Sequence, residues 1–378
     1  MTPLGRLHEH GQSAWLDYID RSFLASGELD RLVRDHGLRG VTSNPKIFMK
    51  AMSEGDDYDE QFNQLLDENR NLDTSALYER MAIDDIRSAA DVLRPVYDES
   101  DGADGFVSFE VSPHLAYDTA GTIEEARRLF ATVDRPNALI KVPATQQGIP
   151  AIETLLSEGI HVNITLMFSL AHYEAVAQAY IKAVERAKAP QKIASVASFF
   201  ISRIDRAVDE QLDALRTDNA MALKSRVAIA NAKVTYQRFR ELFHGPAFEK
   251  ARRRGARPQR VLWASTSPKN PDYRDVLYIE ELIGPDTVST MPPQTLHAFI
   301  DHGEIRGDTV QRNVAEAQER LDALAKIGID LSDVTEKLQR DGVEKFREPF
   351  EKLFDALEEK RRHFRRPATA PQSVGERR

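Results

Sequence analysis

The sequence predicts an α/β protein, a (β/α)8 or TIM barrel, in which eight parallel strands close into a barrel and helices surround it. Short runs rich in β-branched and aromatic residues recur along the chain, and longer segments with helical periodicity separate them. The chain has 378 residues, which is enough for one such barrel with long loops. Its 41% hydrophobic and 29% charged residues are typical of a globular protein with a sizeable core.

Eight runs have the length and composition of barrel strands. Their alternation with helical segments indicates βαβ units, and eight such units can close a barrel. In chain order the predicted strands are AWLDYI (14–19), GVTSN (40–44), FVSFEV (106–111), ALIKVP (138–143), HVNITL (161–166), ASVASFF (194–200), RVLWAST (260–266) and DTVSTM (286–291).

Several predicted helices have recognisable ends. Thr122 and Glu125 have the spacing of a capping box, so we expect a helix to begin at Thr122. Ser169 can cap the long helix predicted over 170–187. Gly159 can end the helix before the fifth strand, because glycine adopts the left-handed conformation at helix ends at little cost.

Two helical regions lie outside the strand pattern. The segment 45–105 is too long for a loop and has helical patterns at about 58–67 and 73–97, which predicts a helical insertion after the second strand. Residues 332–364 predict a C-terminal helical extension with a kink at Pro349.

The barrel, its insertion and its extension are expected to form a single domain over residues 1–364. The stretch 365–378 is rich in Pro, Arg and polar residues, and we expect it to be a flexible tail.

Charge and composition exclude several classes of function. A net charge of -9 argues against nucleic acid as a partner, since binding its backbone needs a concentrated cationic surface. The absence of cysteine excludes disulfides, thiolate nucleophiles and cysteine-ligated zinc. No stretch approaches the ~20 apolar residues of a membrane span, and the N-terminus lacks the apolar core of a signal peptide. We therefore expect a cytoplasmic protein with no membrane partner.

The strands carry polar residues at positions that should face the barrel interior. Alternate side chains of a strand point to opposite faces, so burial of Val162, Ile164 and Leu166 against helices turns Asn163 and Thr165 inward. The same argument applies to the other strands. The predicted inward set, close to the C-terminal strand ends where barrel enzymes have their active sites, also contains Asp17, Asn44, Glu110 and Lys141.

An inward lysine in such a set has a defined chemistry. Lysine near a strand end is more often an ion-pair partner than a nucleophile, but several buried ionisable groups cost several kcal/mol unless function or pairing retains them. Burial and a nearby cation such as Arg203 favour the neutral amine of Lys141, which can attack a ketone and form a Schiff base. Asp17 and Glu110 supply carboxylates for proton transfer, and Asn44 and Asn163 can hold substrate hydroxyls.

Four blocks of the sequence resemble the transaldolase family. They are GVTSNPKIF, VSFEVSPHLAYDT, LIKVPATQQGIPAIETLLSEGIHVNITLMFS and SFFISRID, and the resemblance extends from about Ala14 to Ile300. It implies a class I aldolase-type barrel without a cofactor or a metal, whose substrates are small sugar phosphates. The chain looks more like the longer bacterial transaldolases than the short fructose-6-phosphate aldolases.

The resemblance also implies roles for individual residues. It makes Lys141 the Schiff-base lysine and Asp17 a catalytic acid or base, and it implies that Glu110, Asn163 and Thr165 together position a catalytic water. The positions that match the family's substrate and phosphate contacts are Asn44, Ser198, Phe200 and Arg203. The alternatives are that Phe200 only packs the barrel and that Arg203 pairs with Asp205.

One departure from the family pattern follows the seventh strand. Many transaldolases have a phosphate-binding arginine there, whereas this chain reads WASTSPKNPDY. Ser265 and Lys269 are the candidate substitutes, and a solvent-exposed turn lysine is the alternative for Lys269.

The resemblance implies transfer of a dihydroxyacetone unit from a ketose phosphate to an aldose phosphate. A lyase that releases dihydroxyacetone and a catalytically inactive sugar-phosphate-binding barrel are the alternatives. His8, Glu9 and His10 could chelate a metal, but a flexible polar terminus explains them better. The oligomeric state is open between a monomer and a homodimer.

Overall fold

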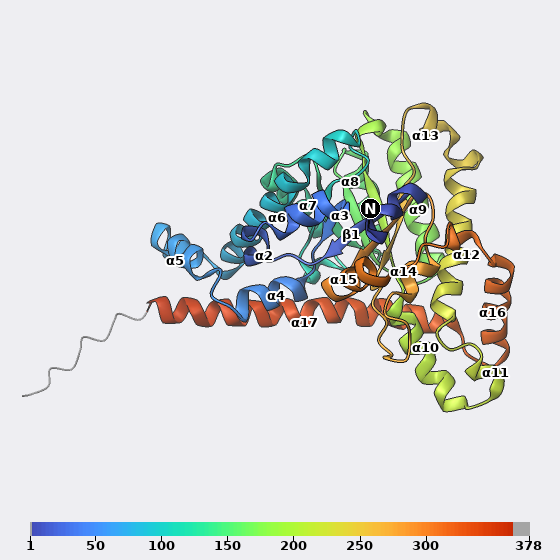
Figure 1. Cartoon of the computed structure of the whole chain (residues 1–378). Coiled ribbons are helices and arrows are strands. Elements are labelled where there is room, and N and C mark those ends of the chain that lie inside the picture. Colours follow the sequence, from blue (N-terminus) through green and yellow to red (C-terminus); the bar gives the residue numbers. More distant parts are fainter. Residues whose placement is uncertain (1, 366–378) are drawn as a thin grey trace, which may run out of the picture.

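The computed structural model describes residues 2–365 and contains a closed barrel of eight parallel strands (Figure 1). Each strand pairs with the next along the chain, and the last pairs with the first. This confirms the predicted TIM barrel. The strands are β1 (Gln12–Asp17), β2 (Gly40–Thr42), β3 (Phe106–Glu110), β4 (Ala138–Pro143), β5 (Val162–Met167), β6 (Ser195–Phe200), β7 (Arg260–Ala264) and β8 (Thr287–Met291).

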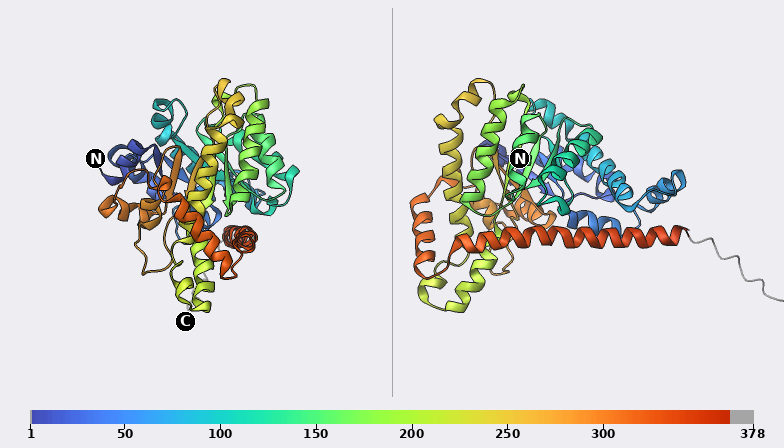
Figure 2. Two further views of the ribbon diagram at one scale, coloured as in Figure 1. Left: turned by 90° about the vertical axis from the view of Figure 1, so that its right-hand side faces the viewer. Right: turned by 180° about the vertical axis from the view of Figure 1, so that it is seen from behind.

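Helices surround the barrel and connect its strands (Figures 1 and 2). The tail predicted after residue 365 lies outside the described residues. The helices are α1 (Pro3–Arg6), α2 (Arg21–Ala25), α3 (Glu28–His36), α4 (Pro45–Ser53), α5 (Asp59–Glu68), α6 (Thr74–Glu99), α7 (Thr119–Val133), α8 (Gly148–Ser157), α9 (Leu170–Arg186), α10 (Ser202–Leu215), α11 (Asp218–Met221), α12 (Val227–Phe243), α13 (Glu249–Arg253), α14 (Leu277–Glu281), α15 (Pro293–His302), α16 (Val314–Lys326) and α17 (Leu331–Arg365).

The core lies between the barrel and these helices, and a buried charge cluster lies at the N-terminal strand ends. Phe109 packs its ring edge against Phe48 of α4, as expected for an outward side chain of β3. At the opposite end of the strands, the buried Asp104 pairs with Arg39 and Arg260. Because the polar active-site candidates lie at the other end, this cluster is structural.

The predicted helix ends are partly confirmed. Ser169 caps α9 by accepting a hydrogen bond from the backbone N–H of His172 at 3.1 Å. Gly159 follows the end of α8 with a φ of 92°, as expected. The capping box at Thr122 is wrong, because Asp118 caps α7, which begins at Thr119.

The two residues of that predicted box have other partners. Thr122 lies inside α7 and its hydroxyl donates to the carbonyl of Leu115. Glu125 accepts from the backbone N–H of Ser112 at 2.6 Å. Asp118 is a stronger cap one turn earlier, so the helix begins there.

The region after β2 is helical as predicted, with one helix more than the sequence indicated. α5 and α6 match the two predicted patterns, and α4 precedes them. α4 begins directly after Asn44, whose side-chain oxygen accepts from the backbone N–H groups of Lys46 and Ile47. Pro45 suits the first helical position, where an N–H would have no partner.

The C-terminal helix α17 crosses the barrel at the C-terminal ends of the strands. Gln339 of α17 donates to the carbonyls of Ala144 and Leu166, which follow β4 and lie at the end of β5. The helix continues through Pro349 as one element of 35 residues, where the sequence predicted a kink (Figures 1 and 2). No helix within residues 2–365 is both long and apolar enough to span a membrane.

The alternation of inward and outward side chains predicted for β5 fails near the C-terminal end of the strand. Leu166 was expected to face outward, but it adopts a φ of 63°, next to a register shift between β5 and β6. Its side chain instead lies against Gly342 of α17. A bulge re-aims one side chain, and here it turns Leu166 toward the C-terminal helix.

Candidate active site

Three polar residues form one row across neighbouring strands. Glu110 of β3 is the register partner of Lys141 of β4, and Lys141 is the register partner of Asn163 of β5. All three are buried. The structure therefore brings together at one level of the barrel the lysine, a carboxylate and an amide that the sequence predicted to face inward.

Lys141 and Glu110 form a buried ion pair. The Nζ atom of Lys141 lies 3.3 Å from Oε2 of Glu110 and donates a hydrogen bond to the carbonyl of Ser43 at 3.1 Å. Burial raises the pKa of Glu110 to about 7, although the positive charge of Lys141 opposes this shift. A carboxyl group with this pKa can both donate and accept a proton near neutral pH.

Asp17 and Asn44 lie together on the other side of the site, and both are half-buried. The hydroxyl of Thr42 donates to Asp17 Oδ1 at 2.8 Å, and the amide of Asn44 lies 3.4 Å from the same oxygen. Thr42 in turn contacts Thr290 of β8 at 2.8 Å. Asp17 is thus held by polar neighbours, and part of its carboxylate stays accessible.

A hydrogen-bonded chain orients the Asn163 amide. Asn163 donates to Ser108 at 2.9 Å and accepts from the Ser198 hydroxyl at 2.7 Å. Ser198 was predicted as a substrate contact, and its contact in the structure is to Asn163. The buried hydroxyl oxygen of Thr165 has no hydrogen-bond partner within residues 2–365, which leaves it free to bind a water or a substrate.

Phe200 and Arg203 lie at the C-terminal end of β6. The guanidinium carbon of Arg203 lies 4.9 Å from the centre of the Phe200 ring. Burial lowers the pKa of Arg203, and the carboxylates of Asp17 and Glu110 oppose this shift. Arg203 is therefore electrostatically coupled to both carboxylates of the site.

Arg203 has no ion-pair partner in the described part of the chain. Asp205, the alternative partner, accepts instead from the hydroxyl of Tyr278 and from the backbone N–H of Ala228. The Nη1 atom of Arg203 is buried and has no hydrogen-bond partner within residues 2–365. A partly buried guanidinium without a carboxylate partner is suited to binding an anion such as phosphate.

Ser265 and Lys269 follow β7 on the same side as Arg203. The Ser265 hydroxyl lies 2.8 Å from that of Ser202 at the start of α10. Lys269 is largely exposed, and partial desolvation and the nearby cations Arg203 and Lys46 lower its pKa. A second cation close to Arg203 is consistent with the predicted phosphate contact.

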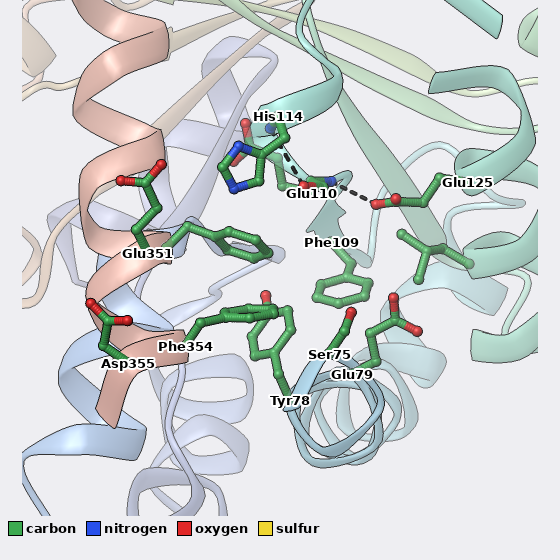
Figure 3. A pocket seen from close by; sticks show the side chains of 13 residues that line it. Ser75, Tyr78, Glu79, Phe109, Glu110, His114, Glu125, Glu351, Phe354 and Asp355 are labelled. Atoms are coloured by element: carbon green, nitrogen blue, oxygen red, sulfur yellow. Dashed lines mark hydrogen bonds between the residues drawn. The ribbon is translucent and has the colours of Figure 1, made fainter. Parts of the chain in front are cut away.

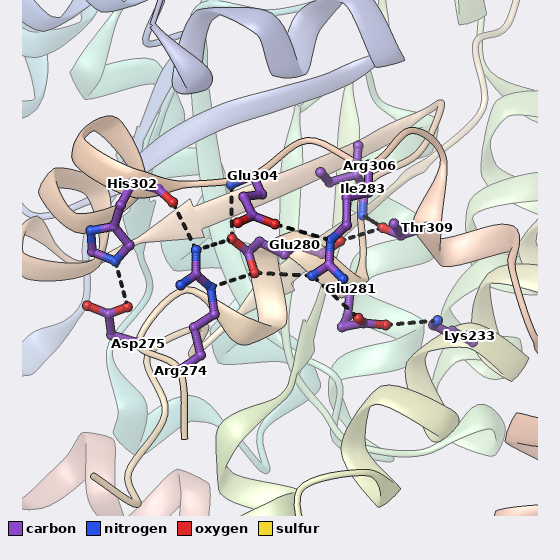
Figure 4. Close-up of polar contacts among 10 residues, drawn as sticks. All are labelled: Lys233, Arg274, Asp275, Glu280, Glu281, Ile283, His302, Glu304, Arg306 and Thr309. Atoms are coloured by element: carbon purple, nitrogen blue, oxygen red, sulfur yellow. Dashed lines mark hydrogen bonds and ion pairs between the residues drawn. The ribbon is translucent and has the colours of Figure 1, made fainter. Parts of the chain in front are cut away.

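Two carboxylates that the sequence analysis did not single out anchor the loop after β7. Tyr273 of this loop donates to Asp209 at 2.6 Å. Arg274 makes two hydrogen bonds of 2.9 Å to Glu280, which is fully buried and also contacts Arg306 at 3.3 Å (Figure 4). These contacts hold the loop that presents Lys269.

Sequence reasoning missed three residues of the site. Thr42 and Ser43 contact Asp17 and Lys141, and their place inside the GVTSN run was the available signal. Phe346 of α17 lies with its ring centre 5.2 Å from Lys141 Nζ. Nothing in the local sequence indicates that contact, since it joins distant segments.

The comparisons with known proteins agree with this geometry. The model of the transaldolase/fructose-6-phosphate aldolase family matches residues 14–357. The chain is 46% identical over 359 residues to a transaldolase of Mycolicibacterium smegmatis, covering 94% of this chain and 96% of the relative. It is 47% identical to a transaldolase of Thermobifida fusca, covering 94% and 97%. The identity to a transaldolase of Acidothermus cellulolyticus is 48%, covering 94% and 96%.

Proposed function

Because this chain belongs to the transaldolase/fructose-6-phosphate aldolase family, we propose that it transfers a dihydroxyacetone unit between sugar phosphates of the pentose phosphate pathway. The donor is a ketose phosphate such as sedoheptulose 7-phosphate or fructose 6-phosphate. The acceptor is an aldose phosphate such as glyceraldehyde 3-phosphate or erythrose 4-phosphate. The observation that supports this most strongly is the buried Lys141 beside Glu110 at the C-terminal end of the barrel.

The reaction begins with a Schiff base on Lys141. The neutral amine attacks the ketone carbon, and the resulting carbinolamine must lose water. Glu110 lies 3.3 Å from the attacking nitrogen and is protonated in part near neutral pH, so it can give the departing hydroxyl its proton. Thr165, whose buried hydroxyl has no hydrogen-bond partner within residues 2–365, and Asn163 on the same strand can hold the water that leaves and later returns.

Carbon–carbon cleavage follows from the protonated imine, which acts as the electron sink. Asp17 takes the proton of the donor's hydroxyl, the adjacent carbon–carbon bond breaks and its electrons form an enamine on Lys141. The aldose phosphate leaves. Asn44 and Asn163 hold hydroxyls of the retained fragment and so keep the enamine oriented for the acceptor.

The phosphate of donor and acceptor binds at Arg203 and Lys269. Arg203 is partly buried, its Nη1 atom has no hydrogen-bond partner in residues 2–365, and Lys269 adds a second charge nearby. Ser265 lies beside them and can add a hydroxyl contact. Binding the phosphate at a fixed distance from Lys141 positions the carbonyl for attack.

A coupled assay with both donor and acceptor tests this function. Fructose 6-phosphate and erythrose 4-phosphate should yield sedoheptulose 7-phosphate and glyceraldehyde 3-phosphate, with little free dihydroxyacetone. The second candidate is a lyase that releases dihydroxyacetone. Phe200 disfavours it, because a phenyl ring offers no hydroxyl to order the water that would protonate the enamine. Release in the absence of acceptor as fast as transfer would support the lyase instead.

A further inference from the structure

The C-terminal helix α17 covers Lys141. We propose that Phe346 of α17 contacts the Lys141-bound enamine and excludes water from it, which makes Phe346 a residue that determines whether the three-carbon unit is transferred or released. This inference rests on the proposed transferase function and assigns to it a residue from outside the barrel.

Phe346 lies directly beside the reacting nitrogen. Its ring centre is 5.2 Å from Lys141 Nζ and 5.8 Å from the guanidinium carbon of Arg203. The residue is only 6% exposed, and Lys141 is 5% exposed. A ring at this distance from Nζ would touch a carbon fragment bound to that nitrogen.

The N-terminal half of α17 is anchored to the barrel. Gln339 donates to the carbonyls of Ala144 and Leu166 at 3.0 and 3.1 Å. Gly342 approaches Leu166 so closely that a Cβ atom there would lie 2.9 Å from its side chain. Residues 339, 342 and 346 lie on one helix face, so these contacts turn Phe346 toward Lys141.

The C-terminal half of α17 is held by a second set of contacts. The ring centre of Phe350 lies 5.5 Å from that of Tyr78 of α6. The ring centre of Phe354 lies 5.7 Å from that of Tyr78, and Figure 3 shows these two side chains together. One turn further, Thr74 donates to Glu358 at 2.8 Å. Phe346 lies between the two anchored halves, so the helix acts as a fixed cover over Lys141.

A groove beside this cover contains two of the proposed phosphate ligands, Arg203 and Lys269. The groove has a volume of about 840 Å³ and lies between α10 and α17. Its lining contains the cations Arg203, Arg206, Lys269, Lys337 and Lys345 and the carboxylates Glu210, Asp330, Asp333 and Asp341. Because Arg203 and Lys269 line this groove, we expect the phosphate of a substrate to bind on this side of α17.

The chemistry of the enamine explains why a water-excluding cover matters. In transfer, the enamine carbon forms a bond to the acceptor carbonyl carbon, whose oxygen takes a proton, and water then hydrolyses the imine. In release, the enamine carbon takes a proton from water, and the same hydrolysis frees dihydroxyacetone. The two routes differ in whether the enamine carbon reacts first with the acceptor carbonyl or with water. Excluding water from this carbon therefore favours transfer.

Substitutions in the full-length protein test this role. Phe346→Leu and Phe346→Ala should increase the ratio of dihydroxyacetone release to transfer, by about tenfold for the alanine variant. The measurement compares initial rates from fructose 6-phosphate with and without erythrose 4-phosphate. In deuterated water, the dihydroxyacetone released should contain deuterium on carbon, because solvent protonates the exposed enamine.

The matched control is Phe354→Leu, the same change two turns further along α17, where the ring contacts Tyr78 and not Lys141. The ratio of dihydroxyacetone release to transfer in this control variant should equal that of the wild type. An unchanged ratio in the folded Phe346→Leu variant, or an equal rise in the control, would overturn the role of Phe346. Wild-type protein that forms no transfer product would instead overturn the proposed function, so the two failures are distinguishable.

Discussion

The Nζ atom of Lys141 lies 3.3 Å from Oε2 of Glu110, and both side chains are buried in the barrel. Removing two opposite charges from water costs several kcal/mol each, and their mutual attraction only partly offsets this cost. A sequence selected for stability alone would place apolar residues there. The pair is therefore best explained by chemistry, and the first two predictions concern its members.

Lys141 should be the residue that becomes covalently modified. Incubation with fructose 6-phosphate and borohydride should add a reduced three-carbon unit, which peptide mass spectrometry should locate at Lys141. Lys141→Arg should abolish both the adduct and turnover, because a guanidinium does not form an imine. The buried Lys233, which pairs with Glu281, provides the control, and Lys233→Arg should keep the adduct. An adduct confined to another lysine would refute the assignment.

Glu110 should give the reaction a pH dependence near its own pKa. Burial raises that pKa to about 7, and the protonated form is the acid that expels water, so kcat/KM of the wild type should fall as the pH rises through about 7. Glu110→Gln does not ionise and should lose this limb. At acidic pH the kcat/KM of this variant should be about 10²-fold lower than that of the wild type, which is the usual contribution of general acid catalysis. A Gln variant that keeps the same pH profile would contradict this role.

Arg203 should contribute to substrate binding through the phosphate. Arg203→Ala should raise KM for fructose 6-phosphate by roughly 10- to 100-fold, since a charged hydrogen bond contributes about 1.5–3 kcal/mol, with a smaller change in kcat. Arg94 of α6 is exposed and pairs with Asp98 away from the groove between α10 and α17, so Arg94→Ala is the matched control. Equal KM values for the two variants would exclude Arg203 as the phosphate ligand.

Metal removal should leave the rate unchanged. The protonated imine supplies the electron sink that a metal-dependent aldolase obtains from its ion. Exhaustive dialysis against a chelator, followed by the coupled assay, measures this directly. Activity that disappears on chelation and returns with one divalent cation would show that the Schiff-base mechanism is incomplete.

Gln339 should stabilise the seating of α17 on the barrel. Gln339→Ala leaves the carbonyls of Ala144 and Leu166 without their donor, so the free energy of unfolding should fall by about 1–3 kcal/mol. Gln318 of α16 is exposed and bonds only Asp322, and Gln318→Ala should change stability little. Urea unfolding of both variants compares the two. Equal stabilities would mean that other contacts hold the helix.

The strand positions and the inward orientation of the polar residues could be predicted from the sequence. A strand alternates its side chains with a period of two, so apolar neighbours such as Ile140 and Val142 determine that Lys141 faces inward. The same local rule placed Glu110 and Asn163. It failed at Leu166, where a bulge changes the alternation. The cap of α7 was also misplaced, since Asp118 and Thr122 are both good caps and only the folded chain selects one.

The sequence by itself therefore determined the barrel and the inward positions of Lys141 and Glu110, because each depends on patterns within a few residues. Only the tertiary structure decided what surrounds them. The path of α17 across the strand ends brings Phe346 to Lys141, and the fold leaves Arg203 without a carboxylate partner in residues 2–365. Such contacts join segments far apart in the chain, and no local periodicity specifies which of many apolar residues will reach the site.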